Sequence, residues 1–72
     1  MSKNPKKKLG ERIRTFRKQV GWSQEELAAA CGLHRTYVGA VERGERNIGL
    51  VNIVQIARSL KVKPSDLMEG VS

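Results

Sequence analysis

One stretch of the chain, residues 22–44, constrains the fold most strongly because it predicts two short helices joined by a tight turn. Its sequence reads WSQEELAAACGLHRTYVGAVERG. Ser23 is placed to cap the first helix, and Glu26 is placed to complete a capping box. Gly32 is the residue type with which helices most often end, and two valines three residues apart then begin a second apolar stripe. Helices joined this closely must cross steeply, so the pattern predicts a helix-turn-helix arrangement.

The rest of the chain predicts three further helices and no strand. Alternation of polar and apolar residues is absent, while apolar residues recur at helical spacing on either side of residues 22–44. A first amphipathic helix is expected to end at Gly21, with an apolar face formed by Leu9, Ile13, Phe16 and Val20. After a polar loop at 44–49, a fourth helix is expected to bury Leu50, Ile53, Ile56, Ala57 and Leu60. Pro64 is suited to the first position of a short fifth helix. The expected fold is all-α, a five-helix domain over residues 9–72.

The length and cysteine content predict one small domain without covalent or metal cross-links. Seventy-two residues support a stability of only about 3–5 kcal/mol. The single Cys31 lies on an apolar stripe, so we interpret it as a small core residue rather than a reactive thiol. No histidine or cysteine cluster offers a metal site, and no cofactor is expected. Self-association is the remaining expected source of stability.

The charge of the chain favours a polyanionic partner. Fourteen lysines and arginines against seven acidic residues give a net charge of +7. Residues 1–8 hold four of the lysines and are expected to form a flexible basic arm, or simply a solvated tail. Nucleic acid is the first expected partner and an acidic membrane the second. No apolar run reaches the length of a membrane span or signal peptide, so a cytoplasmic protein is expected.

The helix expected after residue 34 has a face that the core does not need. Arg35 can donate two hydrogen bonds to guanine, and Thr36 can contact a base edge or a thymine methyl. Tyr37 can pack on the sugar-phosphate wall, or it can be a half-buried aromatic residue. His34 stands at the capping position, where it can cap the helix or contact phosphate. Gly39 is expected to let the helix approach DNA closely, with crowding against a neighbouring helix as the alternative.

One acidic residue is expected on the inward side of this helix. Glu42 lies one turn after Val38, where an unpaired carboxylate would be costly. Arg17 in the first helix is the expected partner, and the resulting buried ion pair would lock the two helices together.

The run GWSQEELAAACGL, followed by YVGAVERG, resembles the phage-repressor and Cro-type helix-turn-helix family, also called the XRE family. Ala28, Gly32, Val38 and Val41 match the small, turn and apolar positions of its pattern. The resemblance implies that Gln24 bonds a phosphate and braces the recognition helix, and that residues 35–37 face the groove. It further implies backbone contacts in the following loop, made by Arg43, Arg46 and Asn47.

A narrower resemblance, carried by RTYVGAVERGERNIGLVNIVQIA, is to controller proteins of restriction–modification systems. These are small dimeric regulators that bind near-palindromic operators and control their own gene and the endonuclease gene. His34 and Gly49 depart from the better capping residues usual in relatives. The resemblance implies double-stranded DNA and a second copy of the chain as partners.

The C-terminal segment is the expected dimer interface, since it is apolar beyond the needs of a small core. Its expected residues are Val62, Leu67, Met68 and Val71. Closure of the core is the alternative for the first two. Glu25, beside the cap of the second helix, is a candidate contact for RNA polymerase, or simply a favourable charge at a helix N-terminus.

The expected function is therefore sequence-specific DNA binding by a transcriptional regulator. A phage-type repressor and an autoregulating antitoxin are alternatives within that class. A protein-interaction module without DNA binding is the alternative from another class, although the basic ends of the third helix do not favour it. An enzyme is not expected, because the sequence offers no nucleophile–base pair or carboxylate pair.

Overall fold

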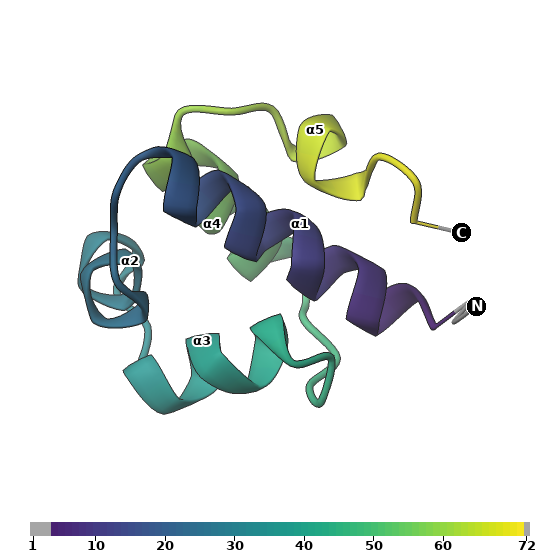
Figure 1. The fold of residues 1–72 in the computed structure, drawn as a ribbon, viewed down its shortest axis with the longest axis horizontal. Coiled ribbons are helices and arrows are strands. Elements are labelled where there is room, and N and C mark those ends of the chain that lie inside the picture. The colour runs from purple at the N-terminus through teal and green to yellow at the C-terminus, as the bar shows by residue number, and fades with distance from the viewer. Residues whose placement is uncertain (1–3, 72) are drawn as a thin grey trace.

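The computed structural model describes residues 4–71, which fold into five helices. These are α1 (Pro5–Gln19), α2 (Gln24–Cys31), α3 (Arg35–Glu42), α4 (Leu50–Leu60) and α5 (Pro64–Met68). Figure 1 shows α3 on one side of the long helix α1 and α5 on the other. The described residues contain no strand, so the all-α, five-helix prediction is confirmed.

The N-terminal helix begins earlier than the sequence predicted. Asn4 caps it by accepting a hydrogen bond from the backbone N–H of Lys6 at 3.0 Å, and Pro5 occupies its first turn. The prediction of a flexible arm over residues 1–8 is therefore wrong for residues 5–8, which are helical. Residues 1–3 lie outside the described part of the chain. The prediction followed the charge of the lysines and overlooked the capping Asn4 and the helix-starting Pro5.

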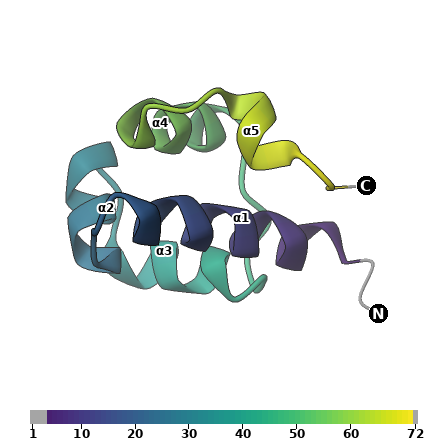
Figure 2. The ribbon, with the colours of Figure 1, turned by 45° about the horizontal axis from the view of Figure 1, so that its top comes forward.

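The helix-turn-helix unit is built as the capping residues predicted. The Ser23 hydroxyl accepts from the backbone N–H of Glu26 at 3.0 Å, and the Glu26 carboxylate accepts from that of Ser23 at 2.8 Å. Gly32 ends α2 with φ of +71°, a left-handed conformation that glycine adopts without a steric penalty. The chain then turns within three residues into α3. Figures 1 and 2 show the two helices crossing steeply.

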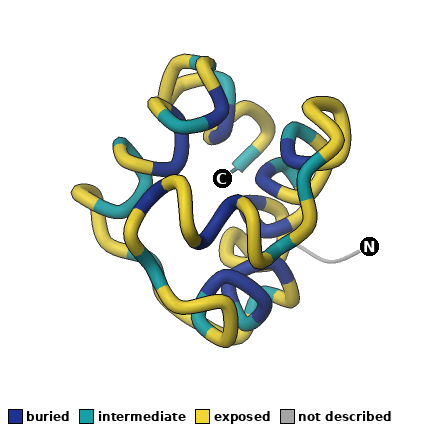
Figure 3. Tube along the Cα trace, turned by 90° about the vertical axis from the view of Figure 1, so that its left-hand side faces the viewer, coloured by how far each residue is buried: buried dark blue, intermediate teal, exposed yellow. Residues whose placement is uncertain are grey.

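A single core holds the helices together. Figure 3 shows that buried and exposed positions alternate along the described chain. The core residues are Leu9, Ile13, Leu27, Ala28, Cys31, Val38, Val41, Ile56, Ala57, Leu60 and Leu67. Burial raises the pKa of the Cys31 thiol, so the thiol stays neutral, as expected of a core cysteine. Among the described residues, no helix has both the length and the apolar character needed to cross a membrane.

Three apolar residues lie elsewhere than the sequence predicted. Val20 and Leu50 were expected in the core but are 46% and 74% exposed, because each stands at a helix end beyond the edge of the core. Leu67 was expected at a dimer interface but is fully buried, since α5 inserts it between α1 and α4. Val62 is half-buried against the same core. The alternative, closure of the core, therefore applies to these two C-terminal residues.

Two contacts set how α3 and α5 lie against α1. A Cβ atom at Gly10 would collide with the backbone carbonyls of Val41 and Glu42, so the glycine allows α1 and α3 to touch through their backbones. On the other side, Arg12 donates from Nη2 and Nε to the main-chain oxygen of Asp66, at 2.6 and 3.2 Å. Its guanidinium also lies 5.0 Å from the centre of the Phe16 ring. Arg12 thus fastens the short helix α5.

Candidate nucleic-acid interface

The exposed edge of α3 is formed by its first residues. Arg35 and Thr36 are exposed, while the inward residues Val38 and Val41 are 1% and 2% exposed. α3 lies at the surface, on the side of α1 opposite α4 and α5 (Figure 2). The structure therefore leaves this basic and polar edge open to a partner.

Tyr37 organises the surface next to that edge. Its hydroxyl accepts a hydrogen bond from Asn52 Nδ2 at 3.1 Å, and the Arg46 guanidinium lies 5.2 Å from its ring centre. Together with Thr36 and Ala40 these residues line an open hollow of about 480 Å³. Tyr37 itself is half-buried, as one of its two sequence-based interpretations expected, while its contact with the sugar-phosphate wall stays a prediction. The cluster connects α3, the following loop and α4 at one place.

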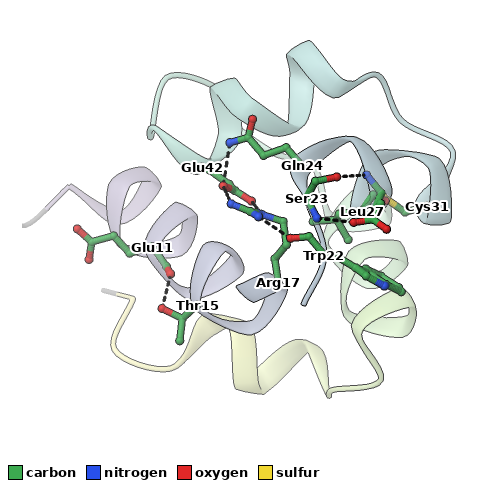
Figure 4. A network of polar contacts seen from close by, with 10 residues as sticks. Glu11, Thr15, Arg17, Trp22, Ser23, Gln24, Leu27, Cys31 and Glu42 are labelled. Carbon is green, nitrogen blue, oxygen red and sulfur yellow. Dashed lines mark hydrogen bonds and ion pairs between the residues drawn. The ribbon is translucent and has the colours of Figure 1, made fainter. Parts of the chain in front are cut away.

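A buried polar network braces α3 from behind (Figure 4). Arg17 Nε donates to Glu42 Oε2 at 2.7 Å, and Arg17 Nη2 donates to Glu42 Oε1 at 3.0 Å. Arg17 Nη1 also donates to the main-chain oxygen of Trp22 at 2.7 Å. Gln24 Nε2 donates to Glu42 Oε1 at 3.0 Å. The ion pair expected between α1 and α3 is thus present, and Gln24 brings α2 into the same network.

The space beside Gly39 is filled by the protein itself, which corrects the sequence-based expectation. A Cβ atom there would lie 3.2 Å from Gln24 Oε1 and 3.2 Å from Arg43 Nη1. Gly39 is buried beneath these side chains rather than presented to a groove. The alternative, crowding against a neighbouring helix, therefore accounts for the glycine. The side chain of Gln24 comes from another helix, so the helical wheel of α3 alone could not reveal the contact.

The loop after α3 displays the basic and polar side chains expected to meet a DNA backbone. Arg43, Arg46 and Asn47 are all exposed. Arg43 Nε lies 3.1 Å from Glu45 Oε2, and this hydrogen-bonded pair raises the pKa of Arg43 and lowers that of Glu45. Both groups are therefore charged at neutral pH. The Glu45 carboxylate partly offsets the positive charge of Arg43.

His34 occupies the capping position of α3, but its side chain makes no capping hydrogen bond. Gly49 likewise starts α4 without a side-chain cap. Asn52, which donates to the Tyr37 hydroxyl, was not predicted from the sequence to lie at this surface. Its only signal was a polar residue within the otherwise apolar run LVNIV.

The steep α2–α3 pair, the braced helix α3 and its exposed basic edge define a DNA-binding type of helix-turn-helix domain. A family model described as helix-turn-helix matches residues 13–67. The chain is 43% identical over 70 residues to control protein C.BamHI of Bacillus amyloliquefaciens, covering 96% of this chain and 86% of that protein. The chain therefore belongs to the helix-turn-helix family.

Solved structures agree with this assignment. The restriction-modification controller protein C.AhdI from Aeromonas hydrophila matches with a TM-score of 0.85 and 50% identity, over 86% of this chain and 94% of that one. The biofilm regulator SinR, solved in complex with DNA, matches with a TM-score of 0.80 and 30% identity, over 83% of this chain and 97% of that one. The resemblance to restriction–modification controllers noted from the sequence is confirmed.

The first prediction concerns the buried ion pair. Glu42→Gln should destabilise the protein by about 3–5 kcal/mol, because it leaves the Arg17 guanidinium buried without a counter-charge. A loss of this size equals the whole stability expected of so small a domain, so helical circular dichroism should show a largely unfolded variant even without urea. Glu11→Gln, which neutralises an exposed glutamate of α1, is the matched control and should change little.

The double variant Arg17→Met/Glu42→Leu should recover most of the lost stability, because it removes both buried charges together. A double variant no more stable than Glu42→Gln would show that the cost does not come from the unpaired charge.

Proposed function

We propose that this protein is a sequence-specific transcriptional regulator that binds a near-palindromic DNA operator as a homodimer. The observation that carries the proposal is the exposed N-terminal edge of α3, held in place by the Arg17–Glu42–Gln24 network. A helix supported in this way can enter the major groove with a fixed orientation. Selection of bound sequences from a random DNA pool is the experiment that tests it.

Each side chain of the surface has a proposed task. Arg35 and Thr36 read base edges in the major groove. Backbone phosphates are contacted by the polar and basic residues around them, which position the helix without reading sequence. These proposed phosphate contacts are Gln24, His34, Tyr37, Arg43, Arg46 and Asn47.

The homodimer follows from the limited reach of a single recognition helix. One α3 covers only a few base pairs, whereas a two-fold dimer places two such helices about 34 Å apart, one turn of DNA. The proposed interface combines the start of α4 with the end of α5. Leu50, Val51 and Met68 are 74%, 69% and 41% exposed. Ile53, one turn after Leu50, shares a surface hollow with Met68 and Val71.

Exposed apolar side chains on so small a domain are best explained by a second copy that covers them. The expected role of Met68 and Val71 is kept in this proposal. The two residues at the start of α4 are added because of their exposure, and Leu67 is removed because it is buried.

The regulated genes are proposed from the similarity to restriction–modification controllers. The protein would bind an operator and control its own gene and that of an endonuclease. The gene would be bacterial or carried by a phage, and the protein would act in the cytoplasm on the DNA of the nucleoid. A phage-type repressor or an autoregulating antitoxin would use the same surface. The neighbouring genes separate these roles, since a methyltransferase and an endonuclease beside this gene support the controller.

RNA polymerase is a further proposed partner. Glu25 is exposed in the first turn of α2 and could meet polymerase bound beside the operator. A variant Glu25→Gln that binds the operator normally should lose activation in an in vitro transcription assay. Full activation by this variant would remove the contact.

Arg35→Ala should weaken operator binding and relax the base preference at one position in each half-site. A bidentate arginine–guanine pair contributes about 1–3 kcal/mol of discrimination, so the preference should fall roughly 5- to 150-fold at that position. Gel-shift titrations with the operator and single-base variants measure it. An equal loss on operator and random DNA would make Arg35 a phosphate contact instead.

The double variant Leu50→Glu/Val51→Glu should remain folded but become monomeric. Two carboxylates in the first turn of α4 favour that helix through its dipole, whereas their charge opposes an apolar interface. Sedimentation equilibrium measures the dimer, and Val20→Gln is the control at an exposed valine outside the proposed surface. Unchanged dimerisation of the double variant would exclude the start of α4 from the interface.

A further inference from the structure

The first turn of α1 carries three consecutive lysines, and all three are exposed. Lys6, Lys7 and Lys8 stand at the end of the helix where the dipole favours negative charge, and the first turn contains no acidic residue. Their mutual repulsion and the dipole both oppose the helix. Residues that oppose their own local structure are expected where a function requires them.

This turn packs directly against the loop that follows α3. A Cβ atom at Gly44 would lie 2.7 Å from the Cα atom and 3.0 Å from the backbone nitrogen of Lys7, and φ of Gly44 is +76°. Only glycine satisfies both the backbone angle and this close approach. Lys6 lines a hollow of about 170 Å³ together with Asn47. Figures 1 and 2 both place the start of α1 beside the end of α3.

The combined surface is strongly positive. Arg43 and Arg46 stand one residue before and two residues after Gly44, which lies against Lys7, and Glu45 is the one acidic residue among residues 43–47. The Glu45 carboxylate is already occupied by Arg43 at 3.1 Å. α3 has eight residues and is therefore about 12 Å long, so this basic surface continues directly from the reading edge at the other end of the helix.

We infer that Lys6 and Lys7 bind phosphates of the operator backbone beyond the groove occupied by α3. This inference rests on the proposed function and adds a site to it. A lysine ammonium is a compact point charge, which binds phosphate without a fixed geometry. When α3 lies in the groove of DNA, the same DNA also meets this surface, because the loop of residues 43–47 follows α3 directly and contacts the first turn of α1. The contacts add affinity and no base preference.

The test is the salt dependence of DNA binding by the double variant Lys6→Gln/Lys7→Gln. Each phosphate contact contributes about 0.9 to the slope of log K against log salt concentration, so losing four contacts in a dimer should reduce the slope by about 3 to 4. Fluorescence anisotropy with operator and random duplexes, between about 50 and 200 mM salt, measures it. Affinity for both duplexes should fall by the same factor.

Two control variants isolate the position of the charges. Lys61→Asn/Lys63→Gln removes two charges from the α4–α5 connection, which lies on the opposite side of α1 from α3, and should leave the slope within one unit of wild type (Figure 1). Lys6→Arg/Lys7→Arg keeps the charges and should keep the slope. Glutamine and lysine have similar helix propensities, and the variant removes charges that oppose the start of α1. Circular dichroism should therefore show Lys6→Gln/Lys7→Gln to be as helical as wild type, and thermal unfolding should show it to be at least as stable.

The failures of the two proposals are distinguishable. An unchanged slope in Lys6→Gln/Lys7→Gln, with operator preference intact in wild type, would overturn the lysine site and leave the regulator standing. An equal loss in Lys61→Asn/Lys63→Gln would also overturn the site, since total charge alone would explain it. A wild-type protein that selects no sequence from a random pool would overturn the proposed function itself.

Discussion

The buried pair of Arg17 and Glu42 determines where the recognition helix lies. It joins α1 to α3 through two hydrogen bonds, and the same two residues also engage the main-chain oxygen of Trp22 and the amide of Gln24. Three helices and the turn between two of them therefore meet at one charged contact. Such a pair adds little net stability, because burying two charges costs nearly what their attraction returns. Its contribution is geometric: rotation of α3 about its axis would separate a buried charge from its partner.

The surface that this pair supports has two kinds of chemistry at its two ends. The start of α3 carries side chains able to read bases, while its end and the following loop carry charges suited to the sugar-phosphate backbone. Tyr37 links the two, because it begins on α3 and contacts both Arg46 of the loop and Asn52 of α4. A movement of the loop on DNA would therefore also move Tyr37, next to the residues that read bases.

Local chemistry made much of this predictable. The capping box and Gly32 located α2, and the carboxylate of Glu42 on an inward face required a cationic partner on another helix. The failures share one cause, the neighbours that a single segment does not reveal. Periodicity placed Leu50 in line with the core but could not show that the core ends before it. Gly39 appeared to face outward because the covering side chain of Gln24 comes from another helix.

The contacts that hold α5 in place involve other side chains than the apolar one that α5 exposes to solvent. Arg12 grips a main-chain oxygen, an atom that every residue type provides, and Leu67 supplies the buried anchor. Met68, the exposed apolar residue at the end of α5, takes no part in either contact. This position is free to change over evolution while the domain keeps its shape. If the proposed dimer forms through this surface, two such proteins in one cell could diverge in partner choice, each pairing only with itself, while the fold and the α3 surface stay the same.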